Sequence, residues 1–131
     1  MSKQLSFVIL STGLESLREM RDALAADGRT RLLAGGDDIE QLYDEVKRLR
    51  PDVAVVTIGA QAEPAFKFVE RLASEFPQTS VICASRDASP DLILRSLRAG
   101  AREFLRLPLS KDELGTVLDR VCEQCSERVE A

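Results

Sequence analysis

Short apolar runs alternate with longer segments of helical periodicity along the chain. Each helical segment repeats its apolar residues at intervals of three and four positions, which is typical of an amphipathic helix. Because parallel strands need helical crossovers, strict alternation favours a parallel sheet covered by helices on both faces. The pattern predicts an α/β fold, a three-layer (βα)5 flavodoxin-like sandwich with a five-stranded parallel sheet. The predicted strands are Leu5–Leu10, Arg31–Ala34, Asp52–Ile58, Ser80–Ala84 and Glu103–Leu105.

Helix start and stop signals separate these segments. Asp37, with Glu40 three residues later, has the spacing of a capping box and predicts the start of the second helix. Ser89 followed by proline predicts the start of the fourth helix, and Gly100 predicts its end. The apolar residues that we expect this fourth helix to turn inward are Leu92, Ile93 and Leu97.

Length and charge narrow the class of protein. The chain has 131 residues, of which 44% are hydrophobic, so it can bury the core of one domain. It carries 18 basic and 22 acidic residues, giving a net charge of −4. This balance argues against nucleic acid as a partner. No apolar run reaches the roughly 18 residues that a membrane span requires, so we expect no direct membrane insertion and a cytoplasmic location.

The absent residue types exclude several kinds of chemistry. The chain contains no histidine, which rules out Ser-His and Cys-His catalysis within it. Its three cysteines do not form a disulfide framework. Cys122 and Cys125 have the CxxC spacing but lie at the end of a predicted helix, where packing is the favoured interpretation over redox or metal binding.

Two stretches of the chain carry a recognisable family pattern. They are Pro51-Asp52-Val53, at the start of the third strand, and the run from Gly100 to Pro108 around the fifth. Both resemble the receiver domains of bacterial response regulators, which are CheY-like. The segment 98–105, followed by Pro108-Leu109 and Asp112-Glu113-Leu114, resembles the receiver-like N-terminal domain of CpaE/TadZ pilus assembly proteins. The resemblance extends over nearly the whole chain and implies a receiver fold.

The residues at the positions of a receiver's phosphorylation site depart from the family. A working receiver has an acidic pair after its first strand, a phosphoacceptor Asp, a Ser or Thr and a Lys. The corresponding residues here are Ser11, Thr12, Thr57, Ser85 and Leu107. Only Ser85 matches, and hydroxyl groups do not replace the carboxylates that hold Mg²⁺. We therefore expect a degenerate phosphoacceptor site, with no catalytic residue, metal or cofactor, and no enzymatic activity.

One alternative keeps a phosphoacceptor. Asp37, Asp38 and Asp87 lie in loops that we expect at the same edge of the sheet as the degenerate site. Any of them could act as an atypical acceptor in two-component signalling, although each also lies at or near a predicted helix start, where capping is the ordinary role of Asp. A small-ligand or flavin site at the strand ends is a third hypothesis, because folds of this kind host many functions.

A charged surface is the main candidate for binding. Arginine is enriched at protein interfaces, and the resemblance implies dimerisation through the fourth helix, fifth strand and fifth helix. A solvated charged face is the competing interpretation. The residues assigned to the interaction surface are Arg95, Arg98, Arg102, Glu103, Phe104 and Arg120.

The sequence thus favours a phosphorylation-independent pseudo-receiver, residues 1–121, that forms a homodimer. Residues 122–131 are expected to form the end of the last helix and a polar tail. The resemblance implies that this tail leads to an ATPase domain outside the chain. It also implies a role in Flp/Tad pilus assembly and localisation, at the cell pole or the inner face of the membrane through partner proteins. A pseudo-receiver attached to another output domain remains an alternative.

Overall fold

Strands and helices alternate in the computed structural model, which describes residues 4–11, 14–59 and 62–130. The strands are β1 (Leu5–Leu10), β2 (Thr30–Gly36), β3 (Val53–Thr57), β4 (Ser80–Ser85) and β5 (Glu103–Arg106). The helices are α1 (Leu14–Ala25), α2 (Ile39–Leu49), α3 (Ala62–Glu75), α4 (Pro90–Ala99) and α5 (Lys111–Glu130). Each strand overlaps its predicted range, with ends that differ by at most two residues.

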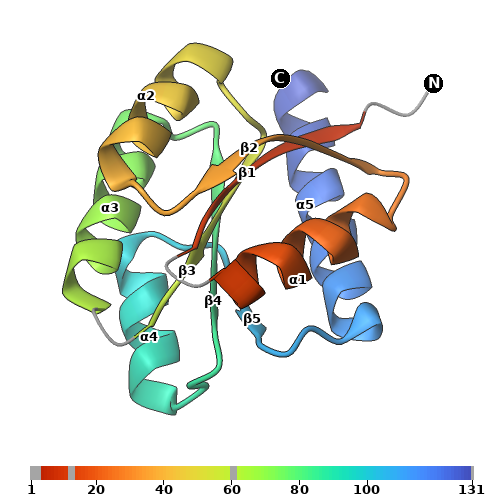
Figure 1. Ribbon diagram of the computed structural model, residues 1–131. Coiled ribbons are helices and arrows are strands. Elements are labelled where there is room, and N and C mark those ends of the chain that lie inside the picture. Colours follow the sequence, from red (N-terminus) through yellow and green to blue (C-terminus); the bar gives the residue numbers. More distant parts are fainter. Residues whose placement is uncertain (1–3, 12–13, 60–61, 131) are drawn as a thin grey trace.

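The strands form one parallel sheet in the order β2-β1-β3-β4-β5. Helices α1 and α5 cover one face of the sheet, and α2, α3 and α4 cover the other (Figure 1). This arrangement confirms the predicted α/β class, the (βα)5 flavodoxin-like topology and the three layers. Because the strands are parallel, their carboxyl ends all lie at the same edge of the sheet.

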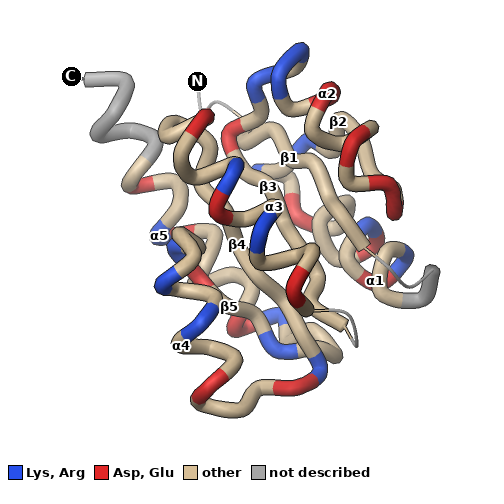
Figure 2. Tube along the Cα trace, turned by 90° about the vertical axis from the view of Figure 1, so that its left-hand side faces the viewer, with Lys and Arg blue, Asp and Glu red and all other residues tan. Residues whose placement is uncertain are grey.

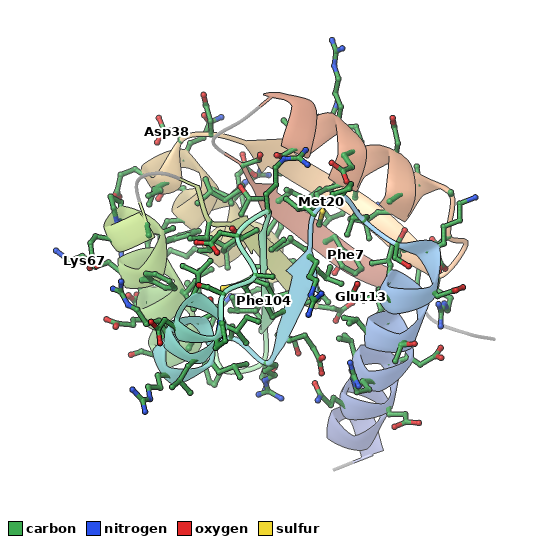
Figure 3. The ribbon with its side chains drawn as sticks, turned by 90° about the horizontal axis from the view of Figure 1, so that it is seen from below. Phe7, Met20, Asp38, Lys67, Phe104 and Glu113 are labelled. Atoms are coloured by element: carbon green, nitrogen blue, oxygen red, sulfur yellow. The ribbon has the colours of Figure 1, made fainter. Side chains whose placement is uncertain are left out.

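Two apolar clusters, one on each face, stabilise the sheet. Strand β3 lies at the centre and is buried along its whole length. Its side chains alternate between the clusters, with Val55 on the side of α1 and α5, and Val56 on the opposite side. Figure 3 shows Phe7 and Met20 within the layer between the sheet and α1. A strand buried on both faces needs the continuous apolar run that the sequence shows here.

One predicted helix boundary was wrong. Asp38, not Asp37, is the N-cap of α2, because its extended backbone lets its side chain accept a hydrogen bond from the Gln41 amide at 3.2 Å. Helix α5 extends to Glu130, past the point after Val121 where the sequence becomes polar. Polarity signals the loss of a buried face, but Glu, Gln and Arg are good helix formers and continue the helix.

Helix α4 is rotated from the orientation predicted by its apolar residues. Ser96 is completely buried, whereas Leu97 and Leu94 are each 45% exposed. The Ser96 hydroxyl donates a hydrogen bond to the Leu92 carbonyl at 2.9 Å, so this polar group is buried without losing a partner. The expectation that Leu97 faces the core was therefore wrong, and α4 presents two leucines to solvent.

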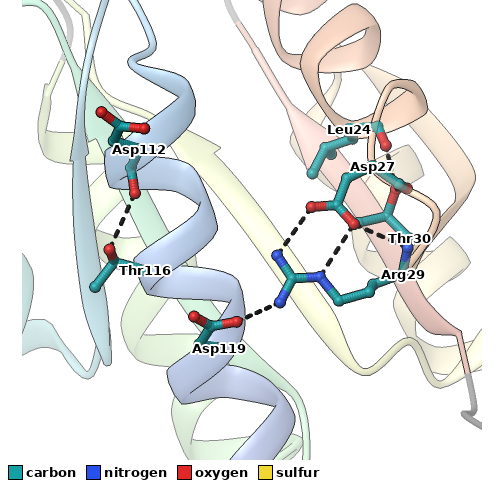
Figure 4. A network of polar contacts seen from close by, with 7 residues as sticks. All are labelled: Leu24, Asp27, Arg29, Thr30, Asp112, Thr116 and Asp119. Carbon is teal, nitrogen blue, oxygen red and sulfur yellow. Dashed lines mark hydrogen bonds and ion pairs between the residues drawn. The ribbon is translucent and has the colours of Figure 1, made fainter.

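A polar network joins the turn between α1 and β2 to α5 (Figure 4). The Arg29 guanidinium forms ion pairs with Asp27 and Asp119, which are far apart in the sequence. Hydrogen bonds from the side chain and backbone of Arg29 lower the pKa of Asp27 below its ordinary value. The network fixes the start of β2 against the helix on the same face of the sheet.

Candidate functional site

Four of the five residues assigned to the degenerate phosphoacceptor site come together at the carboxyl edge of the sheet. Ser11 follows β1, Thr57 ends β3, Ser85 ends β4 and Leu107 follows β5. Thr12, the fifth, lies outside the described residues. The four side chains are between 2% and 7% exposed. The topology therefore produces the predicted juxtaposition, but it places these groups beneath the surface.

Backbone carbonyl groups engage the hydroxyls of this edge. Thr57 Oγ1 donates to the Leu10 carbonyl at 3.2 Å, which joins β3 to β1. Ser85 Oγ donates to the Ile58 carbonyl at 2.8 Å and accepts from the Asp87 amide at 3.1 Å. Both hydroxyl protons are committed to neighbouring backbone, so these side chains connect adjacent segments of the edge. Neither hydroxyl has the geometry of an activated nucleophile, which requires an adjacent base.

Two of the nearby acidic residues accept hydrogen bonds from backbone amides. Asp38 caps α2, and Asp87 Oδ1 accepts from the Ser89 amide at 3.1 Å. Asp37 is exposed. Among the residues that the structure describes, no three His, Cys, Asp or Glu side chains form a group suited to a metal ion. The residues here do not fit Mg²⁺, which prefers octahedral coordination by hard oxygen ligands, usually carboxylates.

One further residue contacts this edge, and nothing in the sequence indicated it. Glu19, on α1, accepts a hydrogen bond from the Leu109 amide at 2.6 Å. Its second oxygen accepts from Arg86 Nη2 at 3.2 Å, with which it also forms an ion pair. The Leu107–Pro108 peptide bond, directly before Leu109, is cis. No local pattern could have indicated Glu19, because its partners lie 67 and 90 residues away in the sequence.

The predicted interaction surface is divided in the structure. Arg95 forms an ion pair with Glu63 on α3 and lies over the Phe66 ring, 4.4 Å from its centroid. Arg102 donates to the Pro77 carbonyl at 3.3 Å, in the segment between α3 and β4. These two arginines therefore contact α3 and the segment that follows it, on the side of the sheet away from α5.

The remaining residues of that surface lie around α4, β5 and α5. Arg120 on α5 forms an ion pair with Glu103 on β5 at 3.0 Å. Phe104 is half-buried and packs against the core on the α4 side of β5, as Figure 3 shows. Arg98 is exposed on α4 beside Leu94 and Leu97. We call the exposed residues Asp91, Leu94, Leu97 and Arg98 the α4 patch.

The charges are mixed over the molecule. Figure 2 shows Lys and Arg positions interspersed with Asp and Glu positions along the described part of the chain. None of the described helices is both long and apolar enough to cross a membrane.

Comparison with solved structures identifies the fold. A protein described as pilus assembly-related, from Burkholderia pseudomallei, superimposes with a TM-score of 0.85 at 23% identity, over 95% of this chain and 94% of the other. A response regulator from Thermotoga maritima gives 0.80 at 21% identity, over 92% and 98%. This chain has a receiver fold. A protein described as the pilus assembly protein CpaE, from Burkholderia thailandensis, gives 0.82 at 23% identity, over 92% and 99%.

The resemblance deduced from sequence is thereby confirmed at the level of the fold. Receiver domains and pilus-assembly proteins both share this receiver fold with the chain. No protein-family profile matches the sequence, and no curated protein matches it. The identities are low, so the likeness is one of architecture.

Proposed function

We propose that this receiver-fold chain is a protein-interaction module that works without phosphorylation and pairs with a second copy of itself. The burial of the Thr57 hydroxyl and its hydrogen bond to the Leu10 carbonyl are the observations that carry this proposal. A receiver phosphoacceptor must reach a metal ion and a phosphoryl donor. Thr57 is instead a structural contact between two strands.

The α4 patch supplies a surface for self-association. Leu94 and Leu97 each leave nearly half of their surface in water, and burying such side chains favours association. A two-fold interface must be complementary to itself. Asp91 and Arg98 meet this requirement because they lie two helical turns apart, on either side of the leucines. When two α4 helices pack antiparallel, Asp91 of each lies near Arg98 of the other.

The biological setting belongs to the same proposal. Structural likeness to proteins described as pilus-assembly components supports a role for this module in pilus assembly and localisation. In that setting we propose that the module is cytoplasmic, is held at the inner face of the membrane through partner proteins, and works together with an ATPase domain. Attachment to another output domain is the alternative, and the pairing surface would serve either.

Substituting Leu94 and Leu97 by glutamate should weaken self-association strongly. Two carboxylates in the apolar centre of the interface abolish the favourable burial of the leucine side chains and repel the same groups of the other copy. The dimer Kd should therefore rise about 30-fold or more. Light scattering after size exclusion over a concentration series measures the effect. Lys67→Glu, on the exposed surface of α3, changes the net charge equally and should leave the Kd unchanged.

The antiparallel geometry has its own test. Asp91→Arg and Arg98→Asp should each raise the dimer Kd, whereas the double variant should return toward the value of the unmodified chain. A chain that stays monomeric at every concentration would refute self-association. If the glutamate variant kept the dimer Kd of the unmodified chain, self-association would stand but the α4 patch would not be its interface.

Beryllofluoride with Mg²⁺ should leave the melting temperature and oligomeric state unchanged. No three carboxylates among the described residues form a group that could hold a metal ion, so the phosphoryl mimic has no ion to join it to the protein. Thermal unfolding with Mg²⁺ alone and with both additives provides the measurement, and a receiver with a complete acidic set serves as the positive control. A magnesium-dependent rise in melting temperature would instead favour the atypical phosphoacceptor.

A further inference from the structure

We propose that Glu19 is an internal latch that holds the β4–α4 and β5–α5 connections in one arrangement in the absence of any ligand. This inference rests on the proposed function, because these connections support the surface assigned to self-association. It concerns a different residue from any in the degenerate phosphoacceptor site. One carboxylate on α1 contacts both connections at once.

The two contacts differ in strength. The Leu109 amide donates to Glu19 Oε1 at 2.6 Å, a short distance typical of a hydrogen bond to a charged acceptor. The Arg86 contact is longer, at 3.2 Å, and the Arg86 side chain is 54% exposed against 24% for Glu19. Solvent screens the second contact more than the first. The Leu109 hydrogen bond is therefore the main part of the latch, and Arg86 orients the carboxylate.

The two partners of Glu19 lie close to the starts of α4 and α5. Arg86 directly follows β4 and lies three residues before Ser89, the N-cap of α4. Leu109 lies between β5 and Lys111, where α5 begins. Glu19 thus contacts the chain just before each of the two helices that flank β5. Holding both connections to α1 limits the movement of α4 and α5 relative to β5.

Two further hydrogen bonds at this edge also hold the β4–α4 and β5–α5 connections in place. The Leu107 amide donates to the Ser85 carbonyl at 3.0 Å, which joins the two connections directly. Ser85 Oγ is already bonded to the Ile58 carbonyl, so this side chain is held in place without a ligand at Thr57. Among the described residues of this edge, contacts within the chain hold these two connections together, as a constitutive module requires.

Amide hydrogen exchange followed by NMR tests the latch. In Glu19→Ala, exchange at Leu109 should accelerate about tenfold or more, because a charge-assisted hydrogen bond is lost. Exchange should also accelerate at the first hydrogen-bonded amides of α4, including Ile93, which donates to the Ser89 carbonyl. Asp22→Ala is the matched control, since Asp22 is an exposed acidic residue of the same helix. Arg86→Ala should give a smaller acceleration than Glu19→Ala.

The outcomes separate this inference from the proposed function. Equal exchange at Leu109 in Glu19→Ala and Asp22→Ala would overturn the latch, as would acceleration confined to Leu109 with α4 unaffected. Both results are read from the monomer as well as the dimer. A monomeric chain with the expected exchange pattern would therefore retain the latch and refute self-association alone.

Discussion

Replacing Gly100 by alanine should lower the free energy of unfolding by about 3 kcal/mol, more than the usual cost of a surface substitution. Gly100 ends α4 with a φ of 125°, a conformation that side chains strongly disfavour. A Cβ at this position would lie 2.4 Å from the Cβ of Ala73 on α3. Because Ala73 is short and held within a helix, the backbones of α3 and α4 must move apart.

Gly115→Ala is the control for this prediction. Gly115 lies inside α5, and nothing lies within 4 Å of the position that its Cβ would occupy. Alanine there should stabilise the protein by up to about 1 kcal/mol, since it removes the entropic cost of glycine in a helix. Urea unfolding of both variants measures the difference. Equal stabilities would contradict the close approach of α3 to α4.

Restoring an acceptor carboxylate by Thr57→Asp should destabilise the chain by about 3 kcal/mol and should not restore phosphorylation. The side chain at this position is 4% exposed, and its hydroxyl donates to the Leu10 carbonyl. An ionised carboxylate loses its hydration there and faces a carbonyl oxygen where a donor is required. Thermal and urea unfolding measure the loss of stability.

Thr57→Asn separates the effect of charge from that of shape. Asparagine matches the size of aspartate and carries an amide donor for the Leu10 carbonyl, so its cost should be about 1 kcal/mol. Adding Mg²⁺ should not rescue Thr57→Asp, because Ser11 provides no carboxylate beside it. A magnesium-dependent recovery with covalent modification by acetyl phosphate would show that the site retains the function of a receiver.

The position of the candidate site was predictable from sequence because it depends on topology. Once the strands are parallel, the residues that follow them meet at one edge, as Ser11, Thr57 and Ser85 do. Their burial and partners were not predictable. Whether the hydroxyl of Thr57 faces solvent or the Leu10 carbonyl depends on the packing between two strands 47 residues apart.

The arrangement of the interaction surface was not predictable from the sequence, for a different reason. The spacing of Arg95 and Arg98 predicts that both lie on the same exposed side of α4. The structure shows that Arg95 instead forms an ion pair with Glu63 on α3. Leu97 matched the apolar pattern of a buried position, but Ser96 is the buried residue, and its hydroxyl can be buried because it donates to the Leu92 carbonyl. Rotation of a helix by a fraction of a turn exchanges such neighbours.

The sequence by itself determined the alternation of strands and helices, the parallel sheet, and the loss of the carboxylates and lysine on which a working receiver depends. The first two features follow from local periodicity, which acts over a few positions. The third follows from the residue types at the positions that match the receiver pattern the sequence resembles. Tertiary structure decided the rotation of α4, the separation of Arg95 from the α5 side, and the contacts of Glu19 with Arg86 and Leu109. Such features arise from packing between distant segments, and a local pattern carries no information about which distant group will complete a hydrogen bond.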